Sequence, residues 1–515
     1  MNIFSAYSVL TSNILGSFTD PFEFQGTYGE PTDGIRQTVF EQVVSQEALI
    51  RNFSDEKVRF LLNDSSASKE EVRAYQKILI DAAIVHDQYH GPTLSEMVTP
   101  DLLQKLENVW KEQNLDPKDL KNFISFVQKY GNQKIFRLLR NNPKEFLGLD
   151  KALRDRAARS GKDLELSILS STYPLKGKNI QELKIDLMEQ LFSKETFALT
   201  KSEEILTKSL TTLDVEKYLG IGAKTQDLEG FCTPAGQVLF YWLYQSLNLH
   251  LVAQDSQMID QINRVKELFV KTLGNPAARA QLLKEKIEGG DFGVVFTQEC
   301  DAAVRAALEE TFLPLGEQNG GDGTFVFLRK DLWAPHYQVL SLLGYSESLK
   351  GKTNLVLATS LLTGEKFLLA SCHGDSNNAA DGRLQISLIM DLFTKEADKH
   401  PGLQLILGAD ANTKSPEEVT LLREHLSQLG LTATSVGPTT IKQRMVTVQH
   451  AKAGRAAIDE EDFLITLKPQ SGGRYHFTNL TVGFSKEKPD LSRPLPDLDH
   501  PSDHYPVGAR FEKLS

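Results

Sequence analysis

Cysteine is scarce in this sequence, with 3 among 515 residues, at Cys232, Cys300 and Cys372. An odd number of widely spaced cysteines excludes the disulfide framework typical of small secreted domains. There is no Cys-x-x-Cys pair, which argues against a structural zinc site. We therefore expect a reducing, cytoplasmic-type compartment.

Long hydrophobic runs are also missing. No window holds 18 uninterrupted apolar residues, so we expect a soluble chain without an integral membrane segment. The first residues lack a basic region and a small-residue cleavage site, so we predict no signal peptide. Export by a route that needs no such signal stays open.

An excess of positive charge is the third feature that the sequence lacks. It has 57 Lys and Arg against 68 Asp and Glu, a net charge of −11. This argues against a protein that coats nucleic acid or an anionic membrane with its whole surface, although a local basic groove stays open. The length suggests two to four domains, each large enough to bury a core.

The pattern of apolar residues divides the chain. Residues 7–12 predict a short strand, and residues from about 35 to about 274 show helical spacing. Four predicted helix starts combine a capping residue with proline at the first helical position. These pairs are Thr99-Pro100, Asp116-Pro117, Asn142-Pro143 and Asn275-Pro276.

From about residue 291 the pattern becomes typical of strands separated by Gly-rich turns and helices. The predicted strands span 293–297, 324–328, 353–358, 366–371, 403–407 and 462–467. One helix is predicted to begin after its cap Ser415, with Pro416 first and Glu418 completing a capping box, and to end at Gly430. Alternating strands and helices favour an α/β or α+β sandwich.

Several apolar runs finish in a polar residue that can bind a metal or a phosphate. These residues are Asn13, Glu299, His373 and Asp410, with Asn412 two positions later and Asp503-His504 before the last apolar run. If the ends converge, three carboxylates would repel one another. A hard divalent cation relieves that repulsion, and Mg²⁺ is usual for phosphate substrates.

The ordered motifs TSN, TQE, SCH, GADAN and SDHYP resemble those of the endonuclease/exonuclease/phosphatase superfamily, the DNase I-like metal-dependent phosphoesterases. FLRKDLW and EEDFLI are similar to two further strands of these enzymes. The resemblance implies a four-layer α/β sandwich that cleaves phosphate esters with Mg²⁺, or alternatively Mn²⁺. It covers residues 1–35 and 275–515, and residues 36–274 are left as an inserted all-α domain.

The resemblance also implies a role for each motif residue. Glu299, Asn13 and Asp503 would hold the metal, with Asp503 also contacting the attacking water. Asp410 would orient or deprotonate the water, and Asn412 would hold both the water and a phosphate oxygen. His504 would hydrogen-bond the phosphate, with its ring supported by Asp462. His373 would stabilise charge on the pentacoordinate phosphorus.

Each residue also has an ordinary structural explanation. Asp410 and Asn412 could form an Asx turn, and Asp503-His504 could be a loop pair. Glu299 could face solvent at a strand end, and His373 could be a core or surface histidine. Asp462 adjoins residues 459–461 and could belong to a solvated acidic turn.

Departures from the superfamily pattern bear on the substrate. Ala411 stands where an aromatic residue is usual, and the Trp-Cys-Asp-Arg signature of phosphoinositide 5-phosphatases is absent. Cys300 and Asp301 follow Glu299, unlike the Gln-Glu-x-Lys of abasic-site endonucleases. We expect phosphodiester cleavage of nucleic acid, with two alternatives: a phosphatase of phosphoinositides or another phosphorylated small molecule, and an inactive sandwich used as a binding module.

Basic residues cluster at one place in this acidic chain. Lys442 and Arg444 lie in a stretch that ends at Arg455, and they could bind substrate phosphates. A solvated loop explains the same stretch equally well. The predicted helical insertion could gate the site, bind a protein partner or carry localisation, and its sequence does not choose among these.

Overall fold

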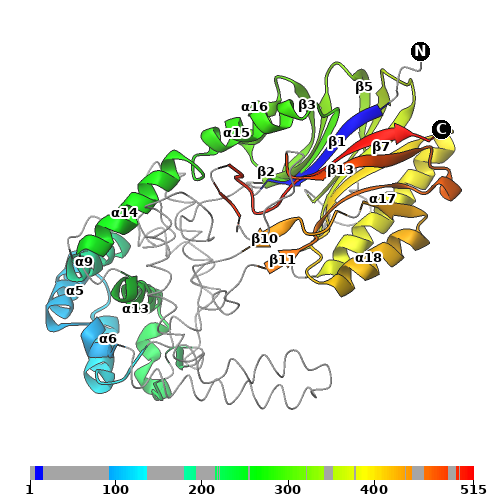
Figure 1. Ribbon diagram of the computed structural model, residues 1–515. Coiled ribbons are helices and arrows are strands. Elements are labelled where there is room, and N and C mark those ends of the chain that lie inside the picture. The colour runs from blue at the N-terminus through cyan, green and yellow to red at the C-terminus, as the bar shows by residue number, and fades with distance from the viewer. Residues whose placement is uncertain are drawn as a thin grey trace, which may run out of the picture.

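The computed structural model (Figure 1) describes the chain in segments. The described residues are 6–14, 92–135, 175, 179–192, 215–216, 219, 221–252, 256–319, 322–340, 352–375, 378–434, 436–442, 457–484, 495–497 and 499–514.

The first sheet joins the two ends of the described chain. Its six strands, in spatial order, are β13 (Tyr475–Val482), β14 (Val507–Lys513), β1 (Ala6–Asn13), β2 (Val294–Cys300), β4 (Asp322–Arg329) and β3 (Phe312–Asn319). β1 runs parallel to β2 and antiparallel to β14, so the first and last described strands are neighbours. The predicted strands at 7–12, 293–297 and 324–328 all lie in this sheet.

The second sheet also has six strands and mixed directions. In spatial order they are β5 (Trp333–Leu340), β6 (Thr353–Ser360), β7 (Lys366–His373), β8 (Gln404–Asp410), β12 (Asp462–Leu467) and β9 (Leu431–Ala433). β7 is parallel to β8, and β12 is antiparallel to β8. The central strands β8 and β12 are buried along their whole length, which explains their near-continuous apolar sequence.

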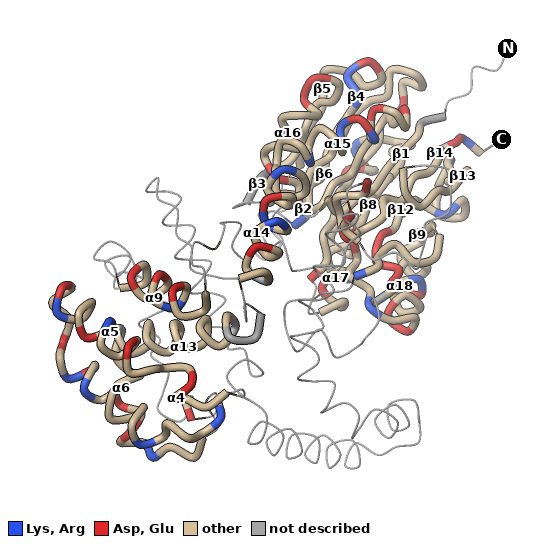
Figure 2. The backbone as a smooth tube through the Cα atoms, turned by 60° about the vertical axis from the view of Figure 1, so that its left-hand side comes forward, with Lys and Arg blue, Asp and Glu red and all other residues tan. Residues whose placement is uncertain are grey.

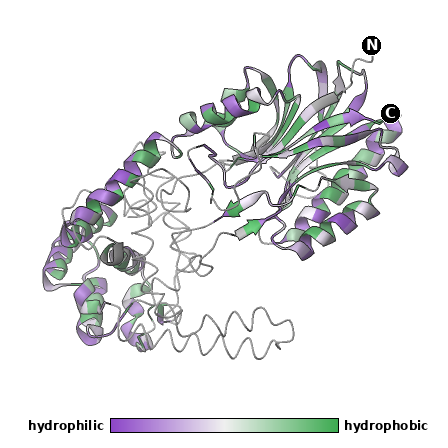
Figure 3. Ribbon diagram, in the orientation of Figure 1, coloured by the Kyte–Doolittle hydropathy of each residue, from purple (hydrophilic) through white to green (hydrophobic). Residues whose placement is uncertain are grey.

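The two sheets pack face to face, with helices on their outer faces (Figure 1). Val9, Phe296, Ile406 and Leu464 are buried between the sheets. The helices are α15 (Pro276–Gly289) and α16 (Ala302–Leu308) on the first sheet, and α17 (Ala379–Lys399) and α18 (Pro416–Gln428) on the second. Figure 3 shows hydrophobic residues recurring along the strands of both sheets. The expected four-layer α/β sandwich is confirmed.

A two-stranded ribbon lies beside the second sheet. β10 (Thr440–Lys442) pairs with β11 (Ala457–Asp459), and isolated bridges join Thr440 to His504 and Lys442 to Leu495. The ribbon is therefore fixed to the segment that precedes β14. A short 3-10 helix, η5 (Pro469–Ser471), leads from β12 towards β13.

Helices with a core of their own occupy the region between β1 and α15. They are α4 (Leu94–Met97), α5 (Pro100–Glu112), α6 (Pro117–Tyr130), α9 (Ile180–Leu191), η1 (Thr225–Asp227), η2 (Glu229–Phe231), α13 (Pro234–Val252) and α14 (Ser256–Lys271). Trp110, Phe126 and Trp242 are buried in this core, which is separate from the three cores of the sandwich. In Figure 2, charges of both signs are mixed along α5, α6 and α9. The domain boundaries at 35/36 and 274/275 stay a prediction.

The predicted caps explain where several helices begin. Thr99, Asp116, Asn275 and Ser415 each accept a hydrogen bond from a backbone N–H of the first turn. The capping box is wrong in one detail, because the Glu418 carboxylate accepts from the Lys414 N–H instead of the Ser415 N–H. The predicted start at Asn142-Pro143 lies outside the described residues.

Among the described helices, none has the length and apolar character needed to cross a membrane.

Candidate active site

The strand directions bring the polar strand ends to one edge of the sandwich. Asn13 and Glu299 stand at or near the carboxyl ends of the parallel strands β1 and β2. His373 and Asp410 end the parallel strands β7 and β8 and are directly paired in register. The antiparallel β12 begins at the same edge, with Asp462 opposite Asp410.

Asn13 links the two sheets at this edge. Its side-chain Nδ2 donates to Glu299 Oε1 at 3.1 Å and to Asp410 Oδ2 at 2.9 Å. Glu299 has a φ of 52°, in the left-handed region, and the register of β2 against β4 shifts between Thr297 and Cys300. A bulge of this kind re-aims a side chain, and here it turns Glu299 towards Asn13. Strained backbone at such a position is common in functional sites.

Buried hydrogen bonds join the two sheets next to these strand ends. Gln298 Nε2 donates to Ser371 Oγ at 3.0 Å and to Thr11 Oγ1 at 3.3 Å. Ser371 Oγ in turn donates to the Thr297 carbonyl at 3.1 Å. Since Thr11 and Gln298 belong to one sheet and Ser371 to the other, these bonds hold the two sheet ends in fixed register.

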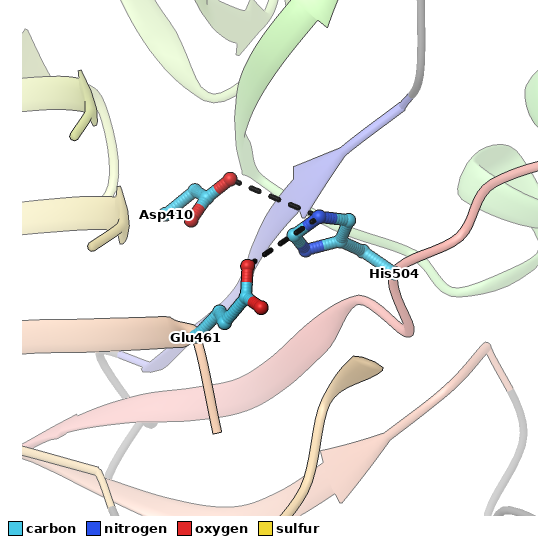
Figure 4. Close-up of side chains that lie close together, drawn as sticks. All are labelled: Asp410, Glu461 and His504. Carbon is cyan, nitrogen blue, oxygen red and sulfur yellow. Dashed lines mark ion pairs between the residues drawn. The ribbon is translucent and has the colours of Figure 1, made fainter. Parts of the chain in front are cut away.

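His504 is held by bonds on its ring and on its backbone. Its Nδ1 lies 2.8 Å from Asp462 Oδ2, while its Nε2 faces Asp410 Oδ2 at 3.9 Å (Figure 4). A carboxylate on Nδ1 fixes the tautomer and the direction of the ring. Ser502 Oγ accepts from the His504 N–H at 3.1 Å and donates to the Asn13 carbonyl at 2.7 Å. The Asp503-His504 segment is thereby tied to the end of β1.

His373 and Asn412 complete the rim of the site. His373 Nε2 lies 3.5 Å from Glu299 Oε1 and 3.7 Å from Asp410 Oδ2. Asn412 has a φ of 50°, its backbone N–H donates to Asp410 Oδ1, and its Nδ2 donates to the Gly374 carbonyl. The Asx turn considered from the sequence is thus present, and it places the Asn412 amide beside the carboxylate of Asp410.

Ala411, where the resemblance led us to expect an aromatic residue, is nevertheless well packed. Ala411 is buried among the apolar residues of the second sheet and its helices. A Cβ at Gly374 or Gly382 would meet the Ala411 carbonyl oxygen at 2.9 or 3.3 Å. The two glycines therefore allow the β7–α17 segment to approach the backbone of Ala411 closely.

Half-buried Lys442 and buried Glu461 lie inside the site. Lys442 Nζ lies 3.2 Å from Glu461 Oε2, 2.9 Å from His504 Nε2 and 3.5 Å from Asp503 Oδ2, and its side chain is 20% exposed. Arg444, the other basic residue expected to bind substrate, lies outside the described residues.

Glu461 was not predicted as a site residue, because it follows Asp459 and Glu460 and resembles part of a solvated acidic turn. It is 1% exposed. The available signal was its position directly before Asp462 and the buried strand that begins there.

Burial and charge shift the pKa values of these carboxyl groups in different directions. Burial raises the pKa of Glu299, and His373 offsets only part of this effect. Burial likewise raises the pKa of Asp462, and raises that of Glu461 to about 7. Burial also acts to raise the pKa of Asp410, but His504, His373 and Lys442 outweigh it, so Asp410 is ionised at neutral pH.

The carboxylates of the site raise the pKa of its two buried basic groups, His504 and Lys442. Burial and Lys442 lower the pKa of His504, but Asp462, Asp503 and Asp410 raise it by more, so the net shift is upward. Burial lowers the pKa of Lys442, and Asp503, Glu461 and Asp410 reverse the shift. The carboxylates thus raise the pKa of both His504 and Lys442, which lie beside an ionised Asp410.

The donor set fits a hard divalent cation. Carboxylates of Glu299 and Asp503 and the amide of Asn13 offer oxygen ligands, which Mg²⁺ and Mn²⁺ prefer. Asp503 acts electrostatically on Glu299, and the raised pKa of Glu299 is what a nearby cation would reverse. A second set, made of Asp410, Glu461 and His504, has ligand atoms within 4.8 Å of one another (Figure 4).

The structure thus places almost all of the predicted site residues at one edge of the sandwich. They are Asn13, Glu299, His373, Asp410, Asn412, Lys442, Asp462, Asp503 and His504. Their individual roles stay predictions. Cys300 and Cys372 are both buried, and burial raises the pKa of the Cys372 thiol to about 12, so Cys372 is not a reactive thiolate at neutral pH.

Comparison with known proteins gives matches to solved structures, whereas no family model and no curated protein matches the chain. The chain is similar to TDP2 of D. rerio complexed with single-strand DNA product, at 18% identity and a TM-score of 0.34, covering 46% of this chain and 93% of that chain. It is similar to an endonuclease/exonuclease/phosphatase family protein from Bacteroides thetaiotaomicron at 16% identity and a TM-score of 0.34, covering 46% and 86%.

A third similar structure is ANGEL2, described as a 2',3'-cyclic phosphatase, at 12% identity and a TM-score of 0.34, covering 45% of this chain and 84% of that chain. With identities of 18% or less and TM-scores of 0.34, these similarities do not carry the activities of those proteins to this chain.

Proposed function

We propose that this chain is a divalent-metal-dependent phosphoesterase of the endonuclease/exonuclease/phosphatase superfamily. One observation carries the proposal: Asn13 Nδ2 bridges Glu299 and Asp410 across the two sheets, with His504 Nε2 3.9 Å from the same Asp410 oxygen. The bridged residues come from motifs hundreds of positions apart in the sequence. Ordinary strand ends and surface turns give no reason for this convergence of carboxylates and imidazoles in a buried place.

The chemistry follows from the charges at this edge. Asp410, kept ionised, accepts the proton of a water molecule whose oxygen attacks phosphorus, while the bond from phosphorus to the leaving oxygen breaks. His504, oriented by Asp462, donates a hydrogen bond to a phosphate oxygen as negative charge builds up. The second N–H of the Asn412 amide can donate to the same phosphate, since the first is used by Gly374.

His373 and the proposed metal site act on the charge of the phosphate. His373, which lies between Glu299 and Asp410, stabilises charge on the pentacoordinate phosphorus. Glu299, Asn13 and Asp503 would hold Mg²⁺ or Mn²⁺, which would supply Lewis-acid polarisation of the phosphate when bound.

We favour a phosphodiester of nucleic acid as the substrate. The chain lacks the Trp-Cys-Asp-Arg signature of phosphoinositide 5-phosphatases, which disfavours a phosphorylated inositol headgroup. Lys442 is turned into the site, so of the two expected basic residues only Arg444 is left to bind phosphates beyond the scissile one. We further propose that residues 36–274 form an inserted helical domain that could bind a protein partner.

A substrate panel tests the activity. Purified protein is incubated with labelled single-stranded RNA and DNA, and separately with phosphoinositide headgroups, in Mg²⁺, Mn²⁺ or EDTA. We expect shortening of a nucleic acid in Mg²⁺ and its loss in EDTA. Release of inorganic phosphate from the headgroups alone would instead select the phosphatase, and shortening that persists in EDTA would reject the metal mechanism.

Asp410→Asn assigns the activity to this site. The amide keeps the shape of the carboxylate but cannot accept the proton, so we expect kcat to fall by roughly 10²–10⁴-fold. Asp398→Asn is the matched control, because Asp398 is exposed on α17 and away from the site. Equal turnover in both variants would overturn the assignment. Wild-type protein that binds these substrates without hydrolysing any would instead support a binding module.

A further inference from the structure

Asp410, Glu461 and His504 look like a second metal site. Their ligand atoms lie within 4.8 Å of one another, all three residues are buried, and Figure 4 shows the two carboxylates facing the imidazole. Asp410 also accepts a hydrogen bond from Asn13, so this set adjoins the proposed ligands Glu299 and Asn13. Paired metal ions in phosphoryl-transfer enzymes stand about 3.5–4 Å apart, and the arrangement of the residues alone would suggest such a pair.

Lys442, however, already contacts two members of this set. Its Nζ lies 3.2 Å from Glu461 Oε2 and 2.9 Å from His504 Nε2. These are the atoms that a second metal ion would use, since His504 Nε2 faces both Glu461 Oε2 and Asp410 Oδ2 at 3.9 Å. The ammonium also lies 3.5 Å from Asp503 Oδ2.

The backbone fixes Lys442 in this position. The Leu495 N–H donates to the Ile441 carbonyl at 2.9 Å, and the Tyr505 N–H donates to the Thr439 carbonyl at 2.6 Å. These bonds lie on either side of Thr440, whose own bridge leads to His504. Since the ribbon and the His504 segment are joined on both sides, Lys442 is held where its side chain enters the site.

We propose that the ammonium of Lys442 takes the place of a second metal ion, so that the site uses a single divalent cation. The inference rests on the proposed function, because it assumes that one cation binds at Glu299, Asn13 and Asp503. An ammonium and a divalent ion cannot both sit against the same ligand atoms about 3 Å away, because the two cations repel each other. Lys442 thus supplies fixed positive charge beside His504, where other enzymes would use a metal.

Metal stoichiometry tests this inference without relying on turnover. Equilibrium dialysis of the full chain against Mn²⁺ gives the number of bound ions, and EPR detects coupling between two ions that share ligands. We expect one Mn²⁺ per chain in the wild type and two in Lys442→Met, whose side chain keeps a similar length without charge. Lys442→Met combined with Glu461→Gln should return to one, because a ligand of the second ion is lost.

The control variant is Lys399→Met, which removes an exposed lysine of α17 and should leave one bound ion. Near-UV circular dichroism establishes that each variant is folded, and Lys442→Gln replaces Lys442→Met if the latter does not fold. A folded neutral variant that binds one Mn²⁺ overturns the inference. A wild-type chain that binds two also overturns it but leaves the proposed mechanism standing, whereas a wild type that binds none and stays active in EDTA overturns both.

Discussion

The Nδ1 side of the His504 ring is oriented by a buried carboxylate. Asp462 is fully buried, and its Oδ2 lies 2.8 Å from His504 Nδ1. A carboxylate in this position accepts the Nδ1 proton and directs Nε2 towards the phosphate, whereas an amide can donate to Nδ1 and favour the opposite tautomer. The position of Nε2 opposite Asp410 is thus a consequence of a residue that does not itself reach the substrate.

We therefore expect Asp462→Asn to lower kcat by roughly 10²–10⁴-fold while KM changes little, since the substrate groups remain in place. Steady-state kinetics on the substrate found in the panel gives the two constants. The matched control is Asp391→Asn, on the exposed face of α17, which should match the wild type. A folded Asp462→Asn enzyme with normal kcat would show that Asp462 does not orient His504.

His500 provides a pH test that is independent of activity. It is 7% exposed, packs against Tyr505 and Phe484, and its Nε2 lies 2.6 Å from the His504 carbonyl. Burial lowers the pKa of His500 to about 4. Between pH 6.5 and 4, His500 is therefore mostly protonated in the unfolded chain and mostly neutral in the folded chain. Stability from this group is complete above pH 6.5 and is lost as pH falls towards 4, by about 3 kcal/mol.

His500→Gln keeps a donor for the His504 carbonyl but cannot titrate. We expect urea unfolding at a series of pH values to show that the wild type loses this stability below pH 6.5 and that the variant does not. The difference between the two proteins should change by up to about 3 kcal/mol across that range. Parallel pH curves for both would mean that folding does not lower the pKa of His500.

At the scale of elements, helix caps and buried strands could be predicted where the contacts that define them involve residues close together in the sequence. The caps Thr99, Asp116 and Asn275 were predicted because a capping side chain bonds to the backbone two or three residues later. The central strands β8 and β12 were predicted because they are buried on both faces. Five motifs in superfamily order then pointed to the sandwich and to its polar strand ends.

Elements and residues defined by distant contacts escaped prediction. β5 has a mostly exposed sequence on a sheet edge, and β10 and β11 are three-residue strands that exist because they pair with each other. Glu461 was missed for the same reason. Its burial depends on Lys442 and His504, and no local pattern reveals that those two residues lie beside it.

The closeness of the two sheets predicts the cost of adding one methyl group at Gly408. A Cβ there would lie 2.5 Å from the Cβ of Phe296, which belongs to β2 in the opposite sheet. A shift of β8 or β2 to make room would displace the site residues at the ends of these strands. We expect Gly408→Ala to lower the free energy of unfolding by about 1–3 kcal/mol, measured by urea denaturation.

Gly289→Ala is the control for this substitution, because nothing lies within 4 Å of its Cβ position. It ends α15, and alanine there should be neutral or should stabilise by up to about 1 kcal/mol. If Gly408→Ala were as stable as the control, the sheets would not be in close contact behind the site.

At the scale of the whole molecule, two neighbouring strands are separated by a long excursion of the chain. β1 ends at Asn13, its parallel neighbour β2 begins at Val294, and the helices of the separate core lie between them in sequence. Such an excursion costs little, because the entropy of closing a loop grows only with the logarithm of its length. The helices between β1 and β2 can therefore change in sequence without altering the site residues on the sandwich.

Separate cores predict separate unfolding. Calorimetry of the full chain should show two transitions, and Mn²⁺ should raise only that of the sandwich, because its proposed ligands belong to that core. Trp242→Ala removes a fully buried ring of the helical core, at a cost of about 3–5 kcal/mol, and should lower only the other transition. A single transition that responds to both Mn²⁺ and Trp242→Ala would show that the helices and the sandwich unfold together, and the boundaries predicted at 35/36 and 274/275 would not mark an independent domain.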